Sequence, residues 1–327
     1  MIVDCYTHMW GTPDQLGRCL PLRFDDDPSA ASDEAAGSGA VAEELDASDR
    51  RAEGGGAAPP RLANPARHFA AAEPADTTIV VGFVSRYLEA EIPNDRIAEY
   101  VGHHPDRLIG FAGIDPSEPK EAIVEVARAQ DELGMPGLAI APAAQDFHPS
   151  NSRAMLVYAE AAERGMPVIF HTGVHVGSAT KMEYARPLLL DEVARELPRL
   201  RIIIAHMGYP WVDETVMLLA KHQHVYAETS WLLRRPWQGF QALLAAYEYG
   251  VMDKLLFGSG FPVSSASCCI EALYGINHLC QGTGLPTIPR EQLRGIVERD
   301  ALSLLGIAPP PSAHAAQPVS AASGDAE

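Results

Sequence analysis

The chain has 327 residues, of which 47% are hydrophobic and 21% are charged, as is typical of a globular enzyme with a large core. Its formal net charge of -18 and its lack of a basic cluster exclude nucleic acid and anionic membranes as expected partners. The start of the chain is neither basic nor a long apolar run, and there is no uncharged apolar run of about 18 residues, which predicts a cytoplasmic protein. Its five cysteines contain no Cys-x-x-Cys pair, so we expect reduced thiols.

Two segments lack the apolar content of a folded core. Residues 25–60 are rich in Ala, Gly, Ser, Asp and Glu, and residues 308–327 include three consecutive prolines. This composition predicts disorder, because too little apolar surface can be buried to offset the entropy of ordering. A mobile lid is the alternative for the first segment, since it follows the first expected strand. We therefore expect one domain over residues 1–307, with an insertion at 25–60 and a disordered tail at 308–327.

Between these segments, short apolar runs alternate with longer amphipathic stretches. Eight runs read as buried parallel strands, since they are apolar on both faces: Ile2–Cys5, Thr78–Val84, Leu108–Ile114, Gly137–Ala141, Pro167–His171, Ile202–His206, Val225–Thr229 and Leu255–Gly258. The expected helices are Pro116–Leu133, Ser150–Arg164, Arg186–Leu197, Val212–His222, Pro236–Tyr249 and Ser265–Cys280. Eight strands that alternate with helices predict an α/β fold, a closed (β/α)8 TIM barrel. A doubly wound open sheet is the second choice, but it often has a glycine-rich phosphate loop, which this sequence lacks.

Histidines occupy the carboxyl ends of three expected strands, where barrel enzymes carry their active sites. His8 follows the first strand, His171 ends the fifth and His206 ends the sixth. A single histidine at a strand end is more often structural. Three imidazoles at matching ends predict a metal-binding or acid–base site.

Four segments carry a resemblance to a known family: Asp4-Cys5-Tyr6-Thr7-His8, Phe170-His171-Thr172-Gly173, Ala205-His206-Met207-Gly208 and Phe257-Gly258-Ser259-Gly260-Phe261-Pro262. Their order and spacing resemble the amidohydrolase superfamily, and most closely its branch that contains aminocarboxymuconate-semialdehyde decarboxylase. The stretch from His104 to Phe111 and the ending from Asp300 to Gly306 are similar to the same branch. The resemblance covers nearly all of the chain outside residues 25–60 and the tail.

The resemblance implies one divalent metal ion, with zinc as the expected ion. It implies His8 and His171 as metal ligands and His206 as the catalytic histidine that activates water or handles a proton. Two positions depart from the family pattern, because Tyr6 stands where a histidine ligand belongs and Gly260 stands where an aspartate ligand belongs. Glycine offers no ligand, and tyrosine ligates as a phenolate although its reference pKa is about 10. We therefore expect either a reduced metal site, in which His8, His171 and His206 supply three nitrogens and Tyr6 is an auxiliary ligand, or a site that has lost its ion.

Other residues extend the candidate site. Glu228, near the end of the seventh strand, could replace the missing carboxylate, although a structural role is the commoner one for such a residue. His175 is a candidate auxiliary ligand, and Ala139 and Ala141 stand where the family often has lysine and histidine. Three arginines that follow strands are candidates for binding a substrate carboxylate, namely Arg86, Arg234 and Arg235.

Two functions of different class are compatible with these residues. The first is an amidohydrolase-like enzyme that hydrolyses or decarboxylates a small carboxylated metabolite, with a metal ion or with histidines alone as acid and base. The second is a catalytically inactive barrel that binds a ligand or a partner protein. The departures at Tyr6 and Gly260 favour the second function, and the three histidines favour the first. The expected partners are a small-molecule substrate and a second copy of the chain in a homodimer.

Overall fold

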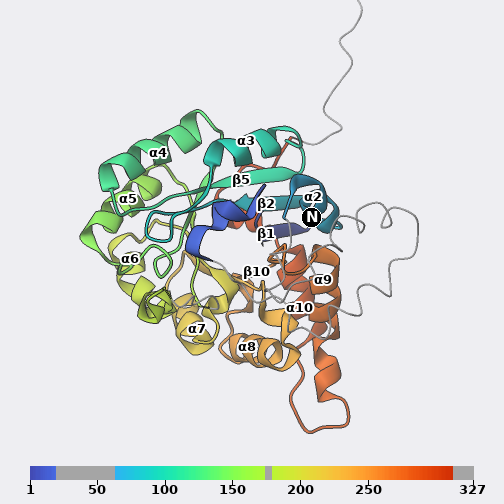
Figure 1. Ribbon diagram of the computed structural model, residues 1–327. Helices are drawn as coiled ribbons and strands as arrows, with labels where there is room; N and C mark the ends of the chain where they lie inside the picture. Colours follow the sequence, from blue (N-terminus) through green and yellow to red (C-terminus); the bar gives the residue numbers. More distant parts are fainter. Residues whose placement is uncertain (20–62, 174–178, 312–327) are drawn as a thin grey trace, which may run out of the picture.

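The computed structural model describes residues 1–19, 63–173 and 179–311, and it has a central ring of parallel strands surrounded by helices (Figure 1). In sheet order the eight strands are β1 (Val3–Thr7), β2 (Thr77–Val81), β5 (Leu108–Gly113), β6 (Gly137–Ile140), β7 (Val168–Phe170), β8 (Ile202–Ile204), β9 (Val225–Glu228) and β10 (Leu255–Leu256). The ring closes between β10 and β1, where the amide of Cys5 donates to the carbonyl of Phe257 over 2.9 Å. Each expected strand overlaps one of these, and the predicted TIM barrel is confirmed.

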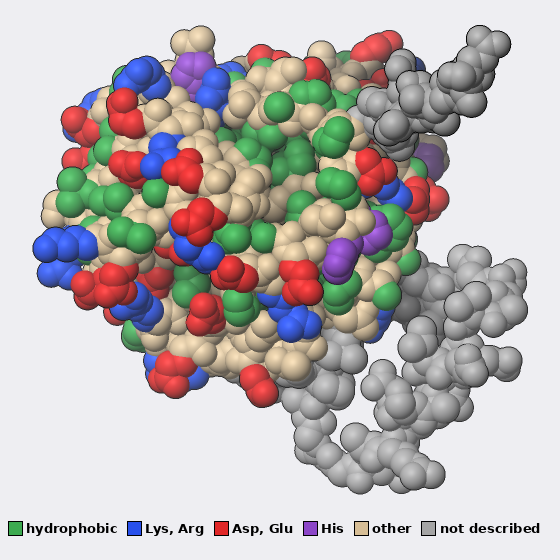
Figure 2. All heavy atoms as spheres, turned by 90° about the horizontal axis from the view of Figure 1, so that it is seen from above, with side chains coloured by type: hydrophobic (Ala, Val, Ile, Leu, Met, Phe, Trp, Pro, Cys, Tyr) green, Lys and Arg blue, Asp and Glu red, His purple; other side chains and the backbone are tan. Residues whose placement is uncertain are grey.

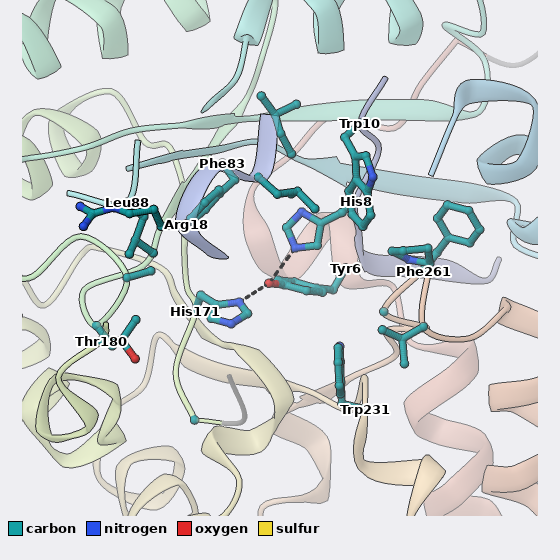
Figure 3. Close-up of a pocket in the computed structure, with 18 of the residues that line it drawn as sticks. Tyr6, His8, Trp10, Arg18, Phe83, Leu88, His171, Thr180, Trp231 and Phe261 are labelled. Atoms are coloured by element: carbon teal, nitrogen blue, oxygen red, sulfur yellow. Dashed lines mark hydrogen bonds between the residues drawn. The ribbon is translucent and has the colours of Figure 1, made fainter. Parts of the chain in front are cut away.

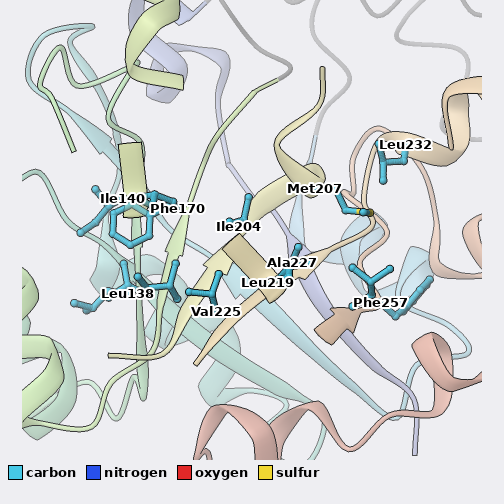
Figure 4. Close-up of a cluster of buried hydrophobic side chains, with 14 of the residues drawn as sticks. Leu138, Ile140, Phe170, Ile204, Met207, Leu219, Val225, Ala227, Leu232 and Phe257 are labelled. Carbon is cyan, nitrogen blue, oxygen red and sulfur yellow. The ribbon is translucent and has the colours of Figure 1, made fainter. Parts of the chain in front are cut away.

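The apolar residues form two layers because alternate side chains of a strand point to opposite sides. In β8, Ile203 belongs to a cluster within the ring of strands, and Ile202 and Ile204 belong to the cluster between strands and helices. Figure 4 shows part of this outer cluster, in which Ile204 lies near Val225 and Ala227. Strands that are buried on both faces are mostly apolar, which is why these strands could be predicted from the sequence.

The six expected helices are present, with shorter bounds: α4 (Pro119–Asp131), α5 (Ser152–Glu163), α6 (Leu190–Glu196), α7 (Val212–Lys221), α8 (Pro236–Glu248) and α9 (Ala266–Gly275). Side-chain caps fix two of the starts, since Asn151 accepts a hydrogen bond from the amide of Arg153 and Ser265 accepts one from the amide of Cys268. Four α-helices in the described ranges had not been expected, and most of them are short: α2 (Pro65–Ala71), α3 (Asn94–Gly102), α10 (Arg290–Glu298) and α11 (Ala301–Leu305).

The expected second strand, Thr78–Val84, was too long. β2 ends at Val81, and the chain leaves the barrel at Gly82 to form the hairpin of β3 (Phe83–Ser85) and β4 (Ala90–Ile92). A Cβ at Gly82 would lie 2.5 Å from the amide nitrogen of Gly113, so this close approach requires glycine. The 3-10 helix η1 (Pro13–Cys19) packs on this hairpin, and the amide of Arg18 donates to the carbonyl of Leu88 over 2.7 Å. Together they form one wall of the barrel mouth.

The surface carries charges of both signs. Acidic and basic side chains are interspersed on the face in Figure 2, and ion pairs such as Arg128 with Asp95 join neighbouring helices. Among the described residues, no helix combines the length and the apolar character needed to cross a bilayer. The predicted insertion at 25–60 lies outside the described residues, as do residues 312–327 of the predicted tail.

Candidate active site

A cavity of about 140 Å³ opens at the carboxyl ends of the barrel strands (Figure 3). Its polar end is formed by Tyr6, His8 and His171, while Arg18 and Thr180 line it elsewhere. No Asp or Glu stands among its described lining residues. The rest of the wall is mainly aromatic and aliphatic: Trp10, Leu16, Phe83, Leu88, Ile92, Trp231, Phe261, Pro262 and Val263. A cavity with this lining suits a small, flat, largely apolar molecule with a polar group at one end.

The hydroxyl of Tyr6 lies between two histidines at the polar end of the cavity. It is 2.5 Å from Nδ1 of His171 and 3.0 Å from Nε2 of His8 (Figure 3). The other nitrogen of His8, Nδ1, lies 2.9 Å from the carbonyl oxygen of Val81, which can only accept, so Nδ1 carries the proton. A neutral His8 then accepts the phenol proton at Nε2, and the Tyr6 oxygen accepts from Nδ1 of His171. The hydrogen bonds form one chain from His171 through Tyr6 and His8 to Val81.

Burial keeps the middle of this chain neutral. It raises the pKa of Tyr6 well above its usual value, and the negative charge of Glu228 raises it further. Burial also lowers the pKa of His8 to about 4, although its hydrogen bond to Val81 acts in the opposite direction. At neutral pH, Tyr6 is therefore a phenol and His8 a neutral imidazole, as the directions of the hydrogen bonds require.

His206 lies in a second layer behind the cavity. It follows β8 in η5 (Ala205–Gly208) and is buried, and its ring meets the rings of Tyr6 and His171 edge-on at 4.9 Å in each case. His206 and Met207 have φ values of 57° and 48°, in the left-handed region that few non-glycine residues adopt. This tight turn holds the ring against the two residues that line the cavity.

Glu228, at the end of β9, lies beside His206. One of its carboxyl oxygens accepts from the amide of His206 and from the hydroxyl of Ser230, both over 2.7 Å, and the other accepts from the amide of Ser230 over 2.6 Å. Burial raises the pKa of Glu228 to about 7, against the effect of these hydrogen bonds. A Cβ on Gly258 would overlap this carboxyl group, so glycine at that position makes room for it.

A second buried carboxyl group, Asp4, stands on β1. Its Oδ1 accepts from the amide of Ser259 over 2.9 Å and from the amide of Tyr6 over 3.3 Å, which joins β1 to the segment after β10. Burial raises its pKa to about 6. Asp4 thus fixes the backbone on which Tyr6 stands.

The divalent ion implied by the family resemblance does not fit these side chains as they are arranged. In the described part of the chain, no group of three or more His, Cys, Asp and Glu side chains could hold a metal ion. The phenol of Tyr6 donates to the lone pair on Nε2 of His8, and a metal ion would need that same lone pair. Gly260 has a φ of 70°, and a Cβ there would lie 3.0 Å from Cβ of Ser230 and from Cδ1 of Trp231. An aspartate could not occupy this position unless Trp231 moved.

The other predicted residues lie around this centre. Arg86 is paired with Glu121 at the surface, and the guanidinium of Arg234 lies over the ring of Trp231 at 5.6 Å. Arg235 is exposed, and none of these three arginines is among the residues that line the cavity. Ala139 and Ala141 border a much smaller space of about 10 Å³ next to His8 and His171. His175 lies outside the described residues.

Sequence reasoning missed three residues that the structure places in or beside the site. Arg18, on η1, is the one described lining residue with a permanent charge. Ser230 links Glu228 to His206, and Asp4 supports Tyr6. Ser230 follows a strand and Asp4 lies within the first family segment, so position alone could have marked both. Arg18 required knowledge of how η1 packs on the hairpin.

Comparison with known proteins places the chain among the amidohydrolases, whose family it matches over residues 3–307. It is 25% identical over 134 residues to the 2-amino-3-carboxymuconate-6-semialdehyde decarboxylase of Dictyostelium discoideum, and the match covers 36% of this chain and 37% of that protein. An uncharacterised TIM-barrel protein of Bordetella bronchiseptica is similar in structure, with a TM-score of 0.64, 21% identity and coverage of 93% of this chain and 98% of that one. A dihydroxybenzoic acid decarboxylase from Polaromonas sp. JS666 with bound manganese has a TM-score of 0.60, 16% identity and coverage of 93% and 96%. The structural matches establish the shared fold, and the match over residues 3–307 shows that the chain belongs to the amidohydrolase family.

Proposed function

We propose that this protein is a metal-independent enzyme that decarboxylates a small, flat carboxylated molecule by acid–base catalysis. The observation that carries the proposal is the Tyr6 hydroxyl, which joins His8 to His171 at the polar end of an otherwise largely apolar cavity. The expected zinc ion is lost in this proposal, because the phenol proton of Tyr6 occupies the lone pair of His8 that would bind it. The bound manganese is a feature of the Polaromonas structure, and the proposal does not assign it to this protein.

Decarboxylation of such a molecule needs one transferable proton and a cavity wall that solvates the carboxylate poorly. His171 in its imidazolium form, with one proton held by Tyr6 at Nδ1 and the other on Nε2, gives the Nε2 proton to the carbon that bears the carboxylate. The bond to the carboxylate carbon then breaks, its electron pair returns to the substrate's π system, and CO2 leaves. His171 recovers a proton from water. An apolar wall assists because the carboxylate loses its charge as the reaction proceeds.

Each residue at the polar end has a distinct part in this scheme. Tyr6 accepts the Nδ1 proton of His171, so the exchangeable proton is on Nε2. His8, anchored to Val81, orients the phenol of Tyr6. Arg18 attracts the anionic substrate to the mouth. Its guanidinium donates to the carbonyl of Tyr87, and its ion pair with Glu89 is 3.7 Å long between two exposed side chains, so the contact with Glu89 is readily exchanged for a substrate carboxylate.

Hydrolysis is the second candidate reaction. It is favoured by the similarity in structure to a probable 2-pyrone-4,6-dicarboxylic acid hydrolase from Acinetobacter baumannii, with a TM-score of 0.59 and 15% identity over 94% of this chain and 99% of that one. Activation of water would need a base, and Nε2 of neutral His171 is the one that the described cavity wall offers, since no carboxylate lines it. Decarboxylation is the stronger candidate because it agrees with the name of the Dictyostelium relative. The homodimer, and substrate binding by Arg86, Arg234 or Arg235, remain predictions.

The test combines metal analysis with a screen for turnover. Protein purified without chelators is analysed by plasma mass spectrometry and assayed for CO2 release from hydroxybenzoates and dienoic acids, with and without a chelator. We expect far less than one equivalent of divalent metal, turnover that the chelator leaves unchanged, and loss of turnover in His171→Ala. The matched control is His278→Ala, which replaces an exposed histidine that does not line the cavity.

Two outcomes would contradict the proposal in different ways. Turnover that appears only with added zinc or manganese would restore the metal mechanism. Binding of these acids without turnover of any of them would favour the inactive barrel.

A further inference from the structure

A second hydrogen-bonded chain lies beneath the cavity, and none of its three residues is among those that line it. It runs from Glu228 through the hydroxyl of Ser230 to Nδ1 of His206, with distances of 2.7 Å and 2.6 Å. All three residues are fully buried. Because Glu228 ends β9 and His206 follows β8, the chain joins the carboxyl ends of two neighbouring strands.

The directions of these hydrogen bonds determine the tautomer of His206. At alkaline pH, above its pKa of about 7, Glu228 is a carboxylate that can only accept, so the hydroxyl of Ser230 donates its one proton to it. The Ser230 oxygen must then accept at its other contact, so Nδ1 of His206 carries a proton and donates it. In a neutral imidazole the second nitrogen, Nε2, is left as the basic one.

The same carboxyl group also holds the backbone of His206. Oε1 of Glu228 accepts from the amide of His206, at a residue whose φ of 57° is unfavourable for a side chain with a Cβ. An apolar side chain could fill this volume, but it would leave the amides of His206 and Ser230 without their acceptor. Glu228 therefore serves as an acceptor for these two backbone amides in addition to filling space.

We propose that Glu228 and Ser230 are positioning residues that hold His206 in its Nδ1-protonated form and fix the plane of its ring. That ring meets Tyr6 at an interplanar angle of 80° and His171 at 81°, so its orientation sets where both cavity residues stand. The inference rests on the proposed function, in which Tyr6 and His171 carry the proton transfer. It assigns a role to two side chains that do not line the cavity.

The experiment reads the tautomer directly. Protein labelled with 15N in its histidines is examined by long-range 1H–15N correlation NMR at alkaline pH, and the His206 signals are identified by their loss in His206→Gln. We expect the pattern of an Nδ1-protonated ring in the native protein. Ser230→Ala should convert it to the Nε2-protonated form or to a mixture, and Ser230→Thr, which keeps the hydroxyl, should restore the native pattern.

A second variant guards against loss of folding in Ser230→Ala. Glu228→Gln replaces an acceptor with an amide that presents a donor to Ser230, and it too should shift His206 away from the Nδ1-protonated form. An Nε2-protonated His206 in the native protein, or an unchanged tautomer in a folded variant of either kind, overturns the proposal. These spectra need no substrate, so they are decided independently of whether the screen for decarboxylation finds turnover.

Discussion

The hydroxyl of Tyr6 lies 2.5 Å from Nδ1 of His171, although the two residues are 165 positions apart in the chain. Tyr6 stands on β1, and His171 follows β7 directly. This contact makes Tyr6 the centre of the polar end of the cavity, because it also reaches His8 through a hydrogen bond and His206 through its ring. At the position where the sequence resemblance implies a histidine ligand, Tyr6 thus contributes a hydrogen-bonding hydroxyl.

Tyr6→Phe should separate the chemistry of this hydroxyl from its packing. The change keeps the buried ring and removes the group that joins His8 to His171. We expect kcat for decarboxylation to fall by about 10²-fold or more, the scale of acid–base catalysis by one positioned group. The free energy of unfolding should fall by about 1–3 kcal/mol, because two histidine nitrogens lose a partner. Steady-state kinetics and urea denaturation measure the two effects.

Tyr158→Phe is the matched control for that variant. Tyr158 is also fully buried, and its hydroxyl has no hydrogen-bond partner among the described residues. Its ring packs on Phe170 away from the cavity lining. Activity should be unchanged in Tyr158→Phe. Equal loss of activity in the two variants would show that Tyr6 acts only through packing.

Restoring the family ligands should recover metal binding only if Trp231 is also replaced. Tyr6→His with Gly260→Asp supplies the two missing ligands, but the new Cβ at position 260 would meet Trp231 at 3.0 Å. We expect the triple variant with Trp231→Ala to bind zinc at least about tenfold more tightly than the double variant, a difference of about 1.4 kcal/mol. Isothermal titration calorimetry compares the two. Equal affinities would mean that Trp231 yields at little cost.

The fold could be predicted from the sequence because the barrel strands, which are buried on both faces, are mostly apolar. The three isoleucines of β8, Ile202–Ile204, show this most clearly. The break at Gly82 was missed because the apolar run continues through it into the hairpin, and only the close approach of Gly113 reveals why the barrel strand ends there.

Only part of the site could be predicted from the sequence. His8 and His171 were placed at the cavity because each stands at a strand end. Sequence position could not show that the turn after β8 would put His206 behind them, since that depends on φ values that non-glycine residues rarely adopt. Nor could it show the order of donors and acceptors, which depends on the distances between residues far apart in the chain.

His68 should make stability depend on pH. It is buried, and it hydrogen-bonds to Thr7 and to Tyr100, both over 2.8 Å. Burial lowers its pKa from 6.5 to about 3. Because the folded-state pKa is the lower one, the unfolded chain binds the extra proton between these values. The stability that His68 contributes is fully present above pH 6.5 and is lost as the pH falls toward 3.

Urea denaturation of the native protein and of His68→Gln over a series of pH values tests this. The difference in unfolding free energy should be constant above pH 6.5 and should fall below it, by up to about 1.4 kcal/mol per pH unit. For His278→Gln, at an exposed histidine, the unfolding free energy should change with pH as it does in the native protein. Parallel curves for His68→Gln would mean that His68 is not desolvated in solution as its contacts imply.

Arg18 should determine the affinity for carboxylated substrates. It is the one cation among the described residues of the cavity wall, and its side chain is 53% exposed, so it can turn from Glu89 to an incoming anion. A hydrogen bond from a charged donor contributes about 1.5–3 kcal/mol, and exposure to solvent favours the lower end of that range. Arg18→Gln should therefore raise KM about tenfold and change kcat little, because Arg18 is not placed to exchange the reacting proton.

The same assay decides between Arg18 and the arginines first expected to bind the substrate. Arg86→Gln is the matched control, since Arg86 is held by Glu121 at the surface and does not line the cavity. Arg18→Lys should keep more of the affinity than Arg18→Gln, because the charge is kept while the paired N–H donors of the guanidinium are lost. A rise in KM with Arg86→Gln or Arg234→Gln, and none with Arg18→Gln, would place the substrate carboxylate beyond β3 or β9 instead of at η1.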